Sequence, residues 1–173
     1  MFQAIILALL PLSFLVAEVK IPDVKSILSE GKAPWELLLD KGDAESLEKA
    51  KALILSLKGE DVLEGLIAMM QKGLGTVDED VLSRVEKASP LNQMKIAHYA
   101  RISKSAKYIP VLLDWAEKSK DTMVRELAIR TLGDCGGAEV IARLEAMIKK
   151  GGLDPFVESA TKASLEKLKK TDS

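Results

Sequence analysis

The side chains that most often do chemistry are scarce in this chain of 173 residues, which has one histidine, His98, and one cysteine, Cys135. A single histidine excludes a multi-histidine zinc or iron site, and a single cysteine excludes an intramolecular disulfide or a Cys-rich metal centre. No G-x-S-x-G nucleophile motif accompanies His98. Cys135 falls in an apolar position of a predicted helix, where we expect a buried, inert thiol. We therefore predict no catalytic residue, no metal ligand and no cofactor.

Two groups of carboxylates remain as candidates, residues 78–80 (Asp-Glu-Asp) and Glu60, Asp61 and Glu64. Both lie at predicted helix starts, where acidic side chains interact favourably with the helix dipole, and neither carries a calcium-loop pattern. With 25 basic and 26 acidic residues, the net charge of −1 gives no overall attraction to nucleic acid. Apolar residues make up 47% and aromatic residues only 4% of the chain, so we expect a soluble domain with an aliphatic core and no nucleic-acid partner.

The elements that must position these residues are best seen in residues 121–150. Asp121 is a suitable N-cap for a first helix, which Gly136 and Gly137 end, and a second apolar stripe follows up to Gly151. The apolar positions have helical spacing in both stripes: Val124, Leu127, Ala128, Thr131, Leu132 and Cys135, then Val140, Ile141, Leu144 and Ile148. Such a hairpin cannot bury both apolar sides alone. It needs neighbouring copies of itself.

The same stretch carries a recognisable pattern. V-R-x-x-A-I-x-T-L-G-x-C-G at residues 124–136, followed by E-V-I-A-R-L at 139–144, resembles the short HEAT-like repeats of the PBS-lyase type, with Ala142 in place of the usual proline. The Ile-Pro start of residues 109–113 is similar to the second helix of that family. The resemblance implies an all-α fold, a short right-handed α-solenoid of helical hairpins. One HEAT-like enzyme family uses His-Glu pairs, which are absent here, and nothing distinguishes a phycobilin lyase.

An internal repeat is predicted by a shift of 78 residues. Five pairs of apolar residues correspond without a gap: Ala50 and Ala128, Ile54 and Leu132, Leu57 and Cys135, Leu63 and Ile141, Leu66 and Leu144. We therefore expect residues 43–70 to form a hairpin equivalent to 121–150. Apolar positions also recur about thirty residues apart, at Met94, Val124 and Val157, a spacing typical of stacked hairpins. Residues 77–88 are either a half-repeat or an extra helix.

The first seventeen residues carry no charged side chain. A helix over residues 2–17 would reach about 24 Å, short of the ~30 Å hydrocarbon core of a bilayer. We expect a signal peptide cut after Ala17, and hence a periplasmic or secreted protein; an uncleaved membrane anchor over residues 2–17 or a buried helix are the alternatives. Residues 18–42 are expected to be a connector and N-terminal cap, and 43–173 the repeat domain. The scarcity of amide side chains resembles the composition of thermophile proteins.

A binding surface is the remaining functional hypothesis. The second helices of stacked hairpins line a shared concave face. Helical spacing places six residues off the core stripe of two such helices: Val111, Asp114, Trp115, Lys118, Arg143 and Lys150. Trp115 is either an exposed anchor for a partner or packs between repeats; in the first case its truncation, like charge reversal of Arg143, weakens binding without unfolding the domain.

The leading interpretation is an exported, non-enzymatic scaffold that binds a protein or peptide. The alternatives are a structural subunit of a membrane-associated envelope complex and a lyase-like accessory enzyme.

Overall fold

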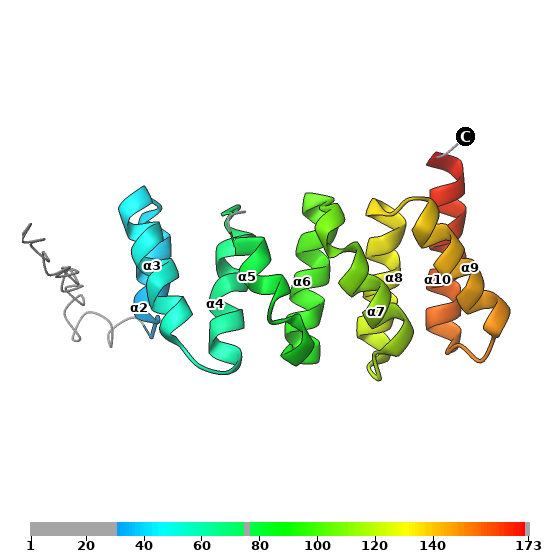
Figure 1. Ribbon diagram of the computed structural model, residues 1–173, viewed down its shortest axis with the longest axis horizontal. Helices are drawn as coiled ribbons and strands as arrows, with labels where there is room; N and C mark the ends of the chain where they lie inside the picture. Colours follow the sequence, from blue (N-terminus) through cyan, green and yellow to red (C-terminus); the bar gives the residue numbers. More distant parts are fainter. Residues whose placement is uncertain (1–30, 75–76, 172–173) are drawn as a thin grey trace, which may run out of the picture.

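The computed structural model describes residues 31–74 and 77–171, and these ranges contain helices and no strand. This confirms the all-α prediction. Figure 1 shows the helices as a single row, with α2 at one end and α10 at the other. The helices are α2 (Pro34–Lys41), α3 (Ala44–Ser56), α4 (Glu60–Gln71), α5 (Asp78–Leu82), α6 (Pro90–Ser103), α7 (Ile109–Lys118), α8 (Thr122–Cys135), α9 (Ala138–Lys150) and α10 (Pro155–Thr171), with 3-10 turns η2 (Val85–Lys87) and η3 (Ala106–Tyr108). The predicted signal peptide lies outside the described residues.

Local sequence signals set the helix boundaries. Asp43 begins α3 by accepting a hydrogen bond from the Ser46 amide at 2.9 Å, and Asp121 begins α8 by accepting from the amides of Met123 and Val124. These side-chain oxygens satisfy amides that have no partner within the helix. Gly59, with a φ of +63°, turns the chain between α3 and α4, a conformation that only glycine adopts readily.

Ion pairs between helices define a first layer formed by α2, α4, α6, α8 and α10. Asp40 pairs with Lys72 at the end of α4, and Glu64 of α4 pairs with Lys95 of α6. Asp134 of α8 then pairs with both Arg101 of α6 and Lys167 of α10. The paired residues lie 32, 31, 33 and 33 positions apart. Direct contacts from α4 to α6, α6 to α8 and α8 to α10 agree with this order.

The other helices, α3, α5, α7 and α9, form a second layer. Lys51 of α3 pairs with Asp80 of α5 at 3.1 Å, and Glu117 of α7 pairs with Arg143 of α9. Between them, the buried Tyr108 hydroxyl donates a hydrogen bond to Asp78 at 2.7 Å and contacts the Met70 sulfur. The described helices therefore alternate between the two layers along the row. We call each first-layer helix and the second-layer helix that follows it a unit: α2–α3, α4–α5, α6–α7 and α8–α9, with α10 last. Among consecutive helices the closest packing is that of α7 on α8 and of α2 on α3.

This pairing corrects the predicted internal repeat. The shift of 78 residues matched α3 to α8 and α4 to α9, but α3 belongs to the second layer and α8 to the first. The apolar match arose because every buried helix here repeats aliphatic residues at the same spacing. The short α5, within the predicted odd element 77–88, occupies the second-layer position of its own unit. The separations of 31 to 33 residues give the actual period.

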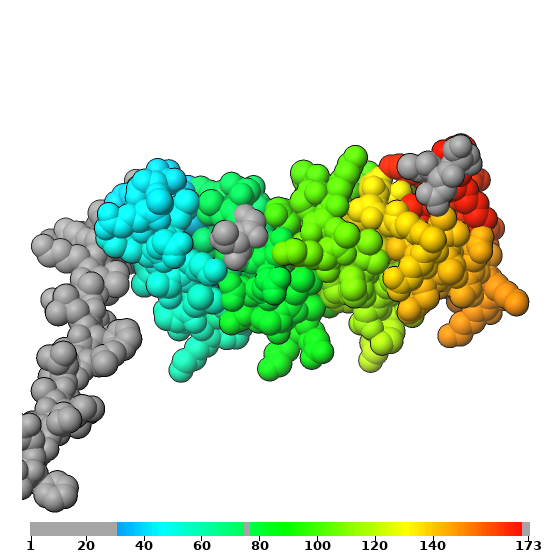
Figure 2. Space-filling model, turned by 45° about the horizontal axis from the view of Figure 1, so that its top comes forward, coloured from blue at the N-terminus to red at the C-terminus, as the bar shows by residue number. Residues whose placement is uncertain are grey.

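The first layer is packed most closely at α8. Thr131 donates to the carbonyl of Ala97 in α6 at 3.2 Å, and Ser164 of α10 donates to the carbonyl of Ile129 at 3.0 Å. Gly133 faces α10 so closely that an added Cβ would lie 2.7 Å from the Ser164 side chain. Small residues at these crossings let the helix backbones approach. Figure 2 shows the units following one another along the long axis in chain order.

Candidate functional site

The six residues predicted to bind a partner divide into two groups in the structure. Arg143 and Lys150 of α9 are exposed and line the same cleft. On α7, Asp114 and Lys118 form an exposed ion pair with each other, and Val111 is half-buried.

Trp115 is only 5% exposed and belongs to the hydrophobic core. The hypothesis that it is an exposed anchor is therefore wrong, and the alternative, packing within the row, is correct. Two of the six candidates remain as a site.

That site, the α7–α9 cleft, has a volume of about 360 Å³. It is bounded by the end of α7, the first turn of α8, the last two turns of α9 and the loop before α10. Its lining residues are Glu117, Arg125, Arg143, Ala146, Met147, Lys150, Gly151, Gly152 and Leu153. Gly151 and Gly152 have φ values of +71° and +70°, so the tight loop at one side of the cleft requires glycine.

The charges around the α7–α9 cleft do not balance. Arg143 donates from Nε to Glu117 at 2.7 Å, and its terminal nitrogen lies 2.6 Å from the same carboxylate oxygen. Arg125 donates from Nε to the carbonyl of Ala116 at 3.1 Å, which fixes the guanidinium at the cleft without neutralising it. Lys150 forms no ion pair within the described residues. Three cations therefore surround a cleft that contains one carboxylate.

The apolar part of the same cleft comes from Met147, which is 8% exposed, the half-buried Leu153 and the exposed Ala146. Cations beside an apolar surface suit a ligand that combines an acidic group with an apolar side chain, since arginine binds carboxylates in planar, two-point geometry. Sequence reasoning missed Arg125 and Glu117. Arg125 was assigned to the repeat pattern, and its position at the cleft depends on a backbone carbonyl, which no side-chain pattern reveals.

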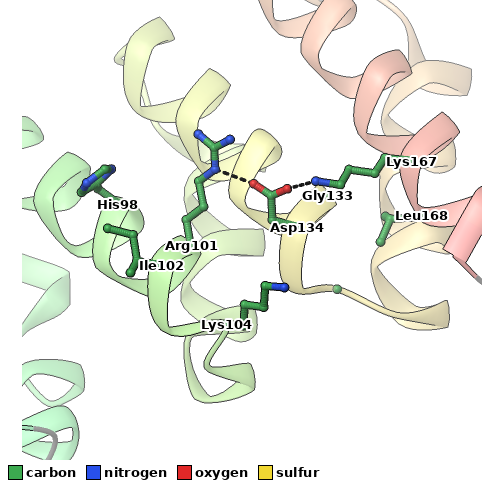
Figure 3. Close-up of a pocket in the computed structure, with 9 residues that line it drawn as sticks. His98, Arg101, Ile102, Lys104, Gly133, Asp134, Lys167 and Leu168 are labelled. Carbon is green, nitrogen blue, oxygen red and sulfur yellow. Dashed lines mark hydrogen bonds and ion pairs between the residues drawn. The ribbon is translucent and has the colours of Figure 1, made fainter. Parts of the chain in front are cut away.

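A second cleft, of about 510 Å³, lies on the first layer between the C-terminal ends of α6, α8 and α10. Figure 3 shows Asp134 between Arg101 and Lys167, with His98 and Ile102 along α6. Asp134 accepts one hydrogen bond on each carboxylate oxygen. The Asp134 carboxylate therefore pairs with two cations from two other helices, an arrangement that holds the first layer together.

The Cys135 thiol is half-buried and bonded within its own helix. The Cys135 thiol donates to the carbonyl of Thr131 at 3.0 Å, and burial, with a smaller effect from the nearby Asp134 charge, raises the pKa of this thiol. A protonated thiol is a poor nucleophile. Within residues 31–74 and 77–171, no group of three or more His, Cys, Asp or Glu side chains is placed to hold a metal ion.

The Asp134 ion pairs make stability depend on pH in a defined direction. Partial burial by itself raises the pKa of Asp134, but hydrogen bonds from Lys167 and Arg101 outweigh it and hold the pKa below the ordinary value of 3.8. A carboxyl whose pKa is lower in the folded state stabilises the fold above its unfolded pKa, and this contribution is lost as the pH falls through the folded pKa. The stabilisation is therefore present at neutral pH and disappears in acid.

We expect Asp134→Asn to lower the thermal unfolding midpoint by about 2–4 °C at neutral pH, which corresponds to about 1 kcal/mol for a pair of exposed cations on one carboxylate. In strong acid the variant and the wild type should unfold at nearly the same temperature. Circular dichroism melts at several pH values measure both. Asp114→Asn, which removes an exposed pair within one helix, is the control and should change little. If Asp134→Asn lowered the unfolding midpoint equally at neutral pH and in strong acid, the stabilisation would not come from the Asp134 ion pairs.

Within the described residues, no helix is long and apolar enough to cross a membrane. The chain matches no protein-family model, and comparisons with curated proteins and with solved structures find no significant match.

Proposed function

We propose that this protein is an exported, non-enzymatic scaffold built as a HEAT-like, right-handed α-solenoid, and that it binds an acidic, partly apolar segment of a protein or peptide in the α7–α9 cleft. The observation that carries the proposal is the excess of cations there, with Arg125, Arg143 and Lys150 opposed only by Glu117. The period of 31 to 33 residues and the HEAT-like pattern of residues 124–144 support the solenoid.

The geometry favours a peptide over a small molecule. The cations of the cleft come from two helices, and its apolar residues lie at the end of α9 and in the loop that follows it, so charged and apolar groups are spread along the surface. An extended segment could place a carboxylate between Arg125 and Lys150 while an apolar side chain contacts Met147 and Leu153. Helical-repeat proteins commonly bind extended partners on the surface formed by their second helices.

The test uses defined peptides. Short fluorescein-labelled peptides with alternating Glu and Leu are titrated with the protein, and peptides with Lys or Gln in place of Glu serve as comparison. We expect the acidic peptide to bind best and Arg143→Glu to weaken its binding by about tenfold or more, because the change places a second carboxylate beside Glu117.

Arg130→Glu is the matched control, since Arg130 is also an exposed arginine paired with one glutamate, Glu126, but lies on α8 outside the cleft. It should retain wild-type affinity. Equal affinity for acidic and basic peptides, or equal losses in the two variants, would refute binding in the α7–α9 cleft.

A further inference from the structure

Three large apolar side chains are exposed at equivalent positions of three neighbouring helices. Leu91, Met123 and Phe156 are each the second residue of their helix, α6, α8 and α10, and they are 56%, 66% and 69% exposed. They lie 32 and 33 residues apart, which is the period of the first-layer ion pairs. We call these three residues the apolar ladder. Isolated exposed apolar residues are ordinary on protein surfaces, but a repeated set on adjacent elements marks an interaction surface.

The ladder forms a line because the three helices are parallel and nearly in register. Thr131 of α8 reaches the carbonyl of Ala97 in α6, and Asp134, three residues further along α8, pairs with Arg101, four residues further along α6. α10 repeats this relationship to α8 through Ser164 and Lys167. The starts of the helices must then lie side by side, at the interaxial spacing of about 8–10 Å typical of packed helices. At the start of α4 the equivalent position is Asp61, so the ladder ends there.

The loops beside the ladder are basic. Figure 1 shows that the segments before α6, α8 and α10 lie along one edge of the row, the lower edge in that view. Residues 83–89, 118–121 and 149–154 contain six Lys or Arg and three Asp or Glu, in a chain whose net charge is −1. Two of the three acids, Asp121 and Asp154, accept hydrogen bonds from helix-start amides.

Three lysines of these loops, Lys87, Lys120 and Lys149, are available for a ligand. Within the described residues, the side chains of these three lysines form no ion pair or hydrogen bond. Their side chains are exposed. Lysines of this kind, next to projecting apolar residues, are the combination that binds peripheral proteins to anionic membrane surfaces.

We infer that this edge docks on an anionic lipid bilayer, with Leu91, Met123 and Phe156 entering the headgroup–acyl boundary and the loop lysines contacting lipid phosphates. Two observations favour a bilayer over a protein. None of the three side chains lines a cleft described above; they project outward, as insertion into a fluid surface requires. Pairing this edge with the same edge of a second copy would bring lysines against lysines, which opposes dimerisation. The inference does not depend on the α7–α9 cleft.

The experiment measures binding of the full-length chain to sedimented vesicles of phosphatidylcholine, with and without phosphatidylglycerol. The triple substitution Leu91→Ser, Met123→Ser and Phe156→Ser should reduce binding to anionic vesicles by about tenfold or more, since each serine removes apolar surface that would be buried. Ile102→Ser is the matched control: Ile102 is also 69% exposed and also lies near lysines, but at the opposite end of α6. It should bind as the wild type does.

The charge of the edge is tested separately. Replacing Lys87, Lys120 and Lys149 with glutamine should weaken binding to anionic vesicles by about tenfold and reduce its dependence on salt. The same change at Lys41, Lys104 and Lys170, three exposed lysines at other places, should have a smaller effect. Preference for vesicles without phosphatidylglycerol, or equal losses in the two lysine variants, would overturn the inference.

A local probe excludes binding through any other part of the chain. In a Cys135→Ser background, an environment-sensitive fluorophore is attached at Met123→Cys or at Ile102→Cys. Contact with anionic vesicles should shift the emission to the blue at position 123 and leave position 102 unchanged. Equal shifts at the two positions, or no shift at position 123, would overturn lipid docking. Analytical sedimentation of the protein without vesicles is a further check. If it showed a dimer that the serine triple variant abolishes, the apolar ladder would be an interface with a second copy and lipid docking would be overturned.

Discussion

Replacing Trp115 with alanine is expected to lower the free energy of unfolding by about 3–5 kcal/mol, the usual loss when a buried tryptophan is truncated and a cavity remains. Trp115 is 5% exposed on α7 and packs in the core together with Leu112, Leu113 and Ala116. Urea unfolding followed by circular dichroism measures the change, because the shift in midpoint at constant slope reports stability.

Two further substitutions test whether the loss at Trp115 comes from removing buried apolar volume or from any truncation on α7. Trp115→Phe retains most of the apolar volume and should cost clearly less than alanine. Lys118→Ala, one turn away at an exposed position, should change the free energy of unfolding by less than about 0.5 kcal/mol. If Trp115→Ala kept wild-type stability but lost peptide binding, the side chain would be a binding residue after all.

The second large effect is expected at Gly133. An added Cβ would lie 2.7 Å from the Cβ and Oγ of Ser164 and 3.0 Å from its Cα. The Ser164 backbone is held in α10 and cannot yield as a flexible side chain would. Gly133→Leu should therefore force α8 and α10 apart and lower the free energy of unfolding by about 3 kcal/mol, at the upper end of overpacking effects.

Gly137 provides the control for the same substitution. It has an extended backbone with a φ of −139°, and an added Cβ there meets no atom within 4 Å. Gly137→Leu should cost about 1 kcal/mol or less, the value for a changed helix N-cap. Thermal and urea unfolding of both variants measure the two losses in free energy of unfolding. Equal losses at the two positions would show that glycine conformation, and not the approach of α8 to α10, sets the cost at Gly133.

The sequence predicted the helices well because their boundaries depend on local chemistry. The caps at Asp43 and Asp121 and the turn at Gly59 are found where their residue types predict them. These signals act over three or four residues, so neighbouring units need not be known. The acidic start of α5 also fell within a helix, as its position indicated.

The layer to which each helix belongs could not be read from the apolar pattern. Ile54 and Leu132 are both fully buried, so the apolar pattern identified both correctly as core residues. It did not show that their helices occupy different layers. The neighbours are identified by residues that contact across helices, such as Asp40 with Lys72. Since Asp and Lys occur throughout this chain, such a pair stands out only once the helices are placed.

The candidate site was half predicted for a similar reason. Arg143 and Lys150 were found because helical spacing put them on one exposed face. Trp115 was placed on the corresponding face of α7, but it is buried in the core, on a helix that contacts both α8 and α9. Arg125 is held at the site by a hydrogen bond to the Ala116 carbonyl. Because every residue has a backbone carbonyl, no sequence pattern indicates this contact.

The side-chain bonds between helices have one more consequence, for the order in which the protein can form. They join residues at most 38 positions apart, the separation of Met70 and Tyr108. Contact order is correspondingly low, which is associated with rapid folding. Each unit can find its partners as soon as about forty further residues have left the ribosome, so the amino-terminal units can be complete while α10 is still being synthesised.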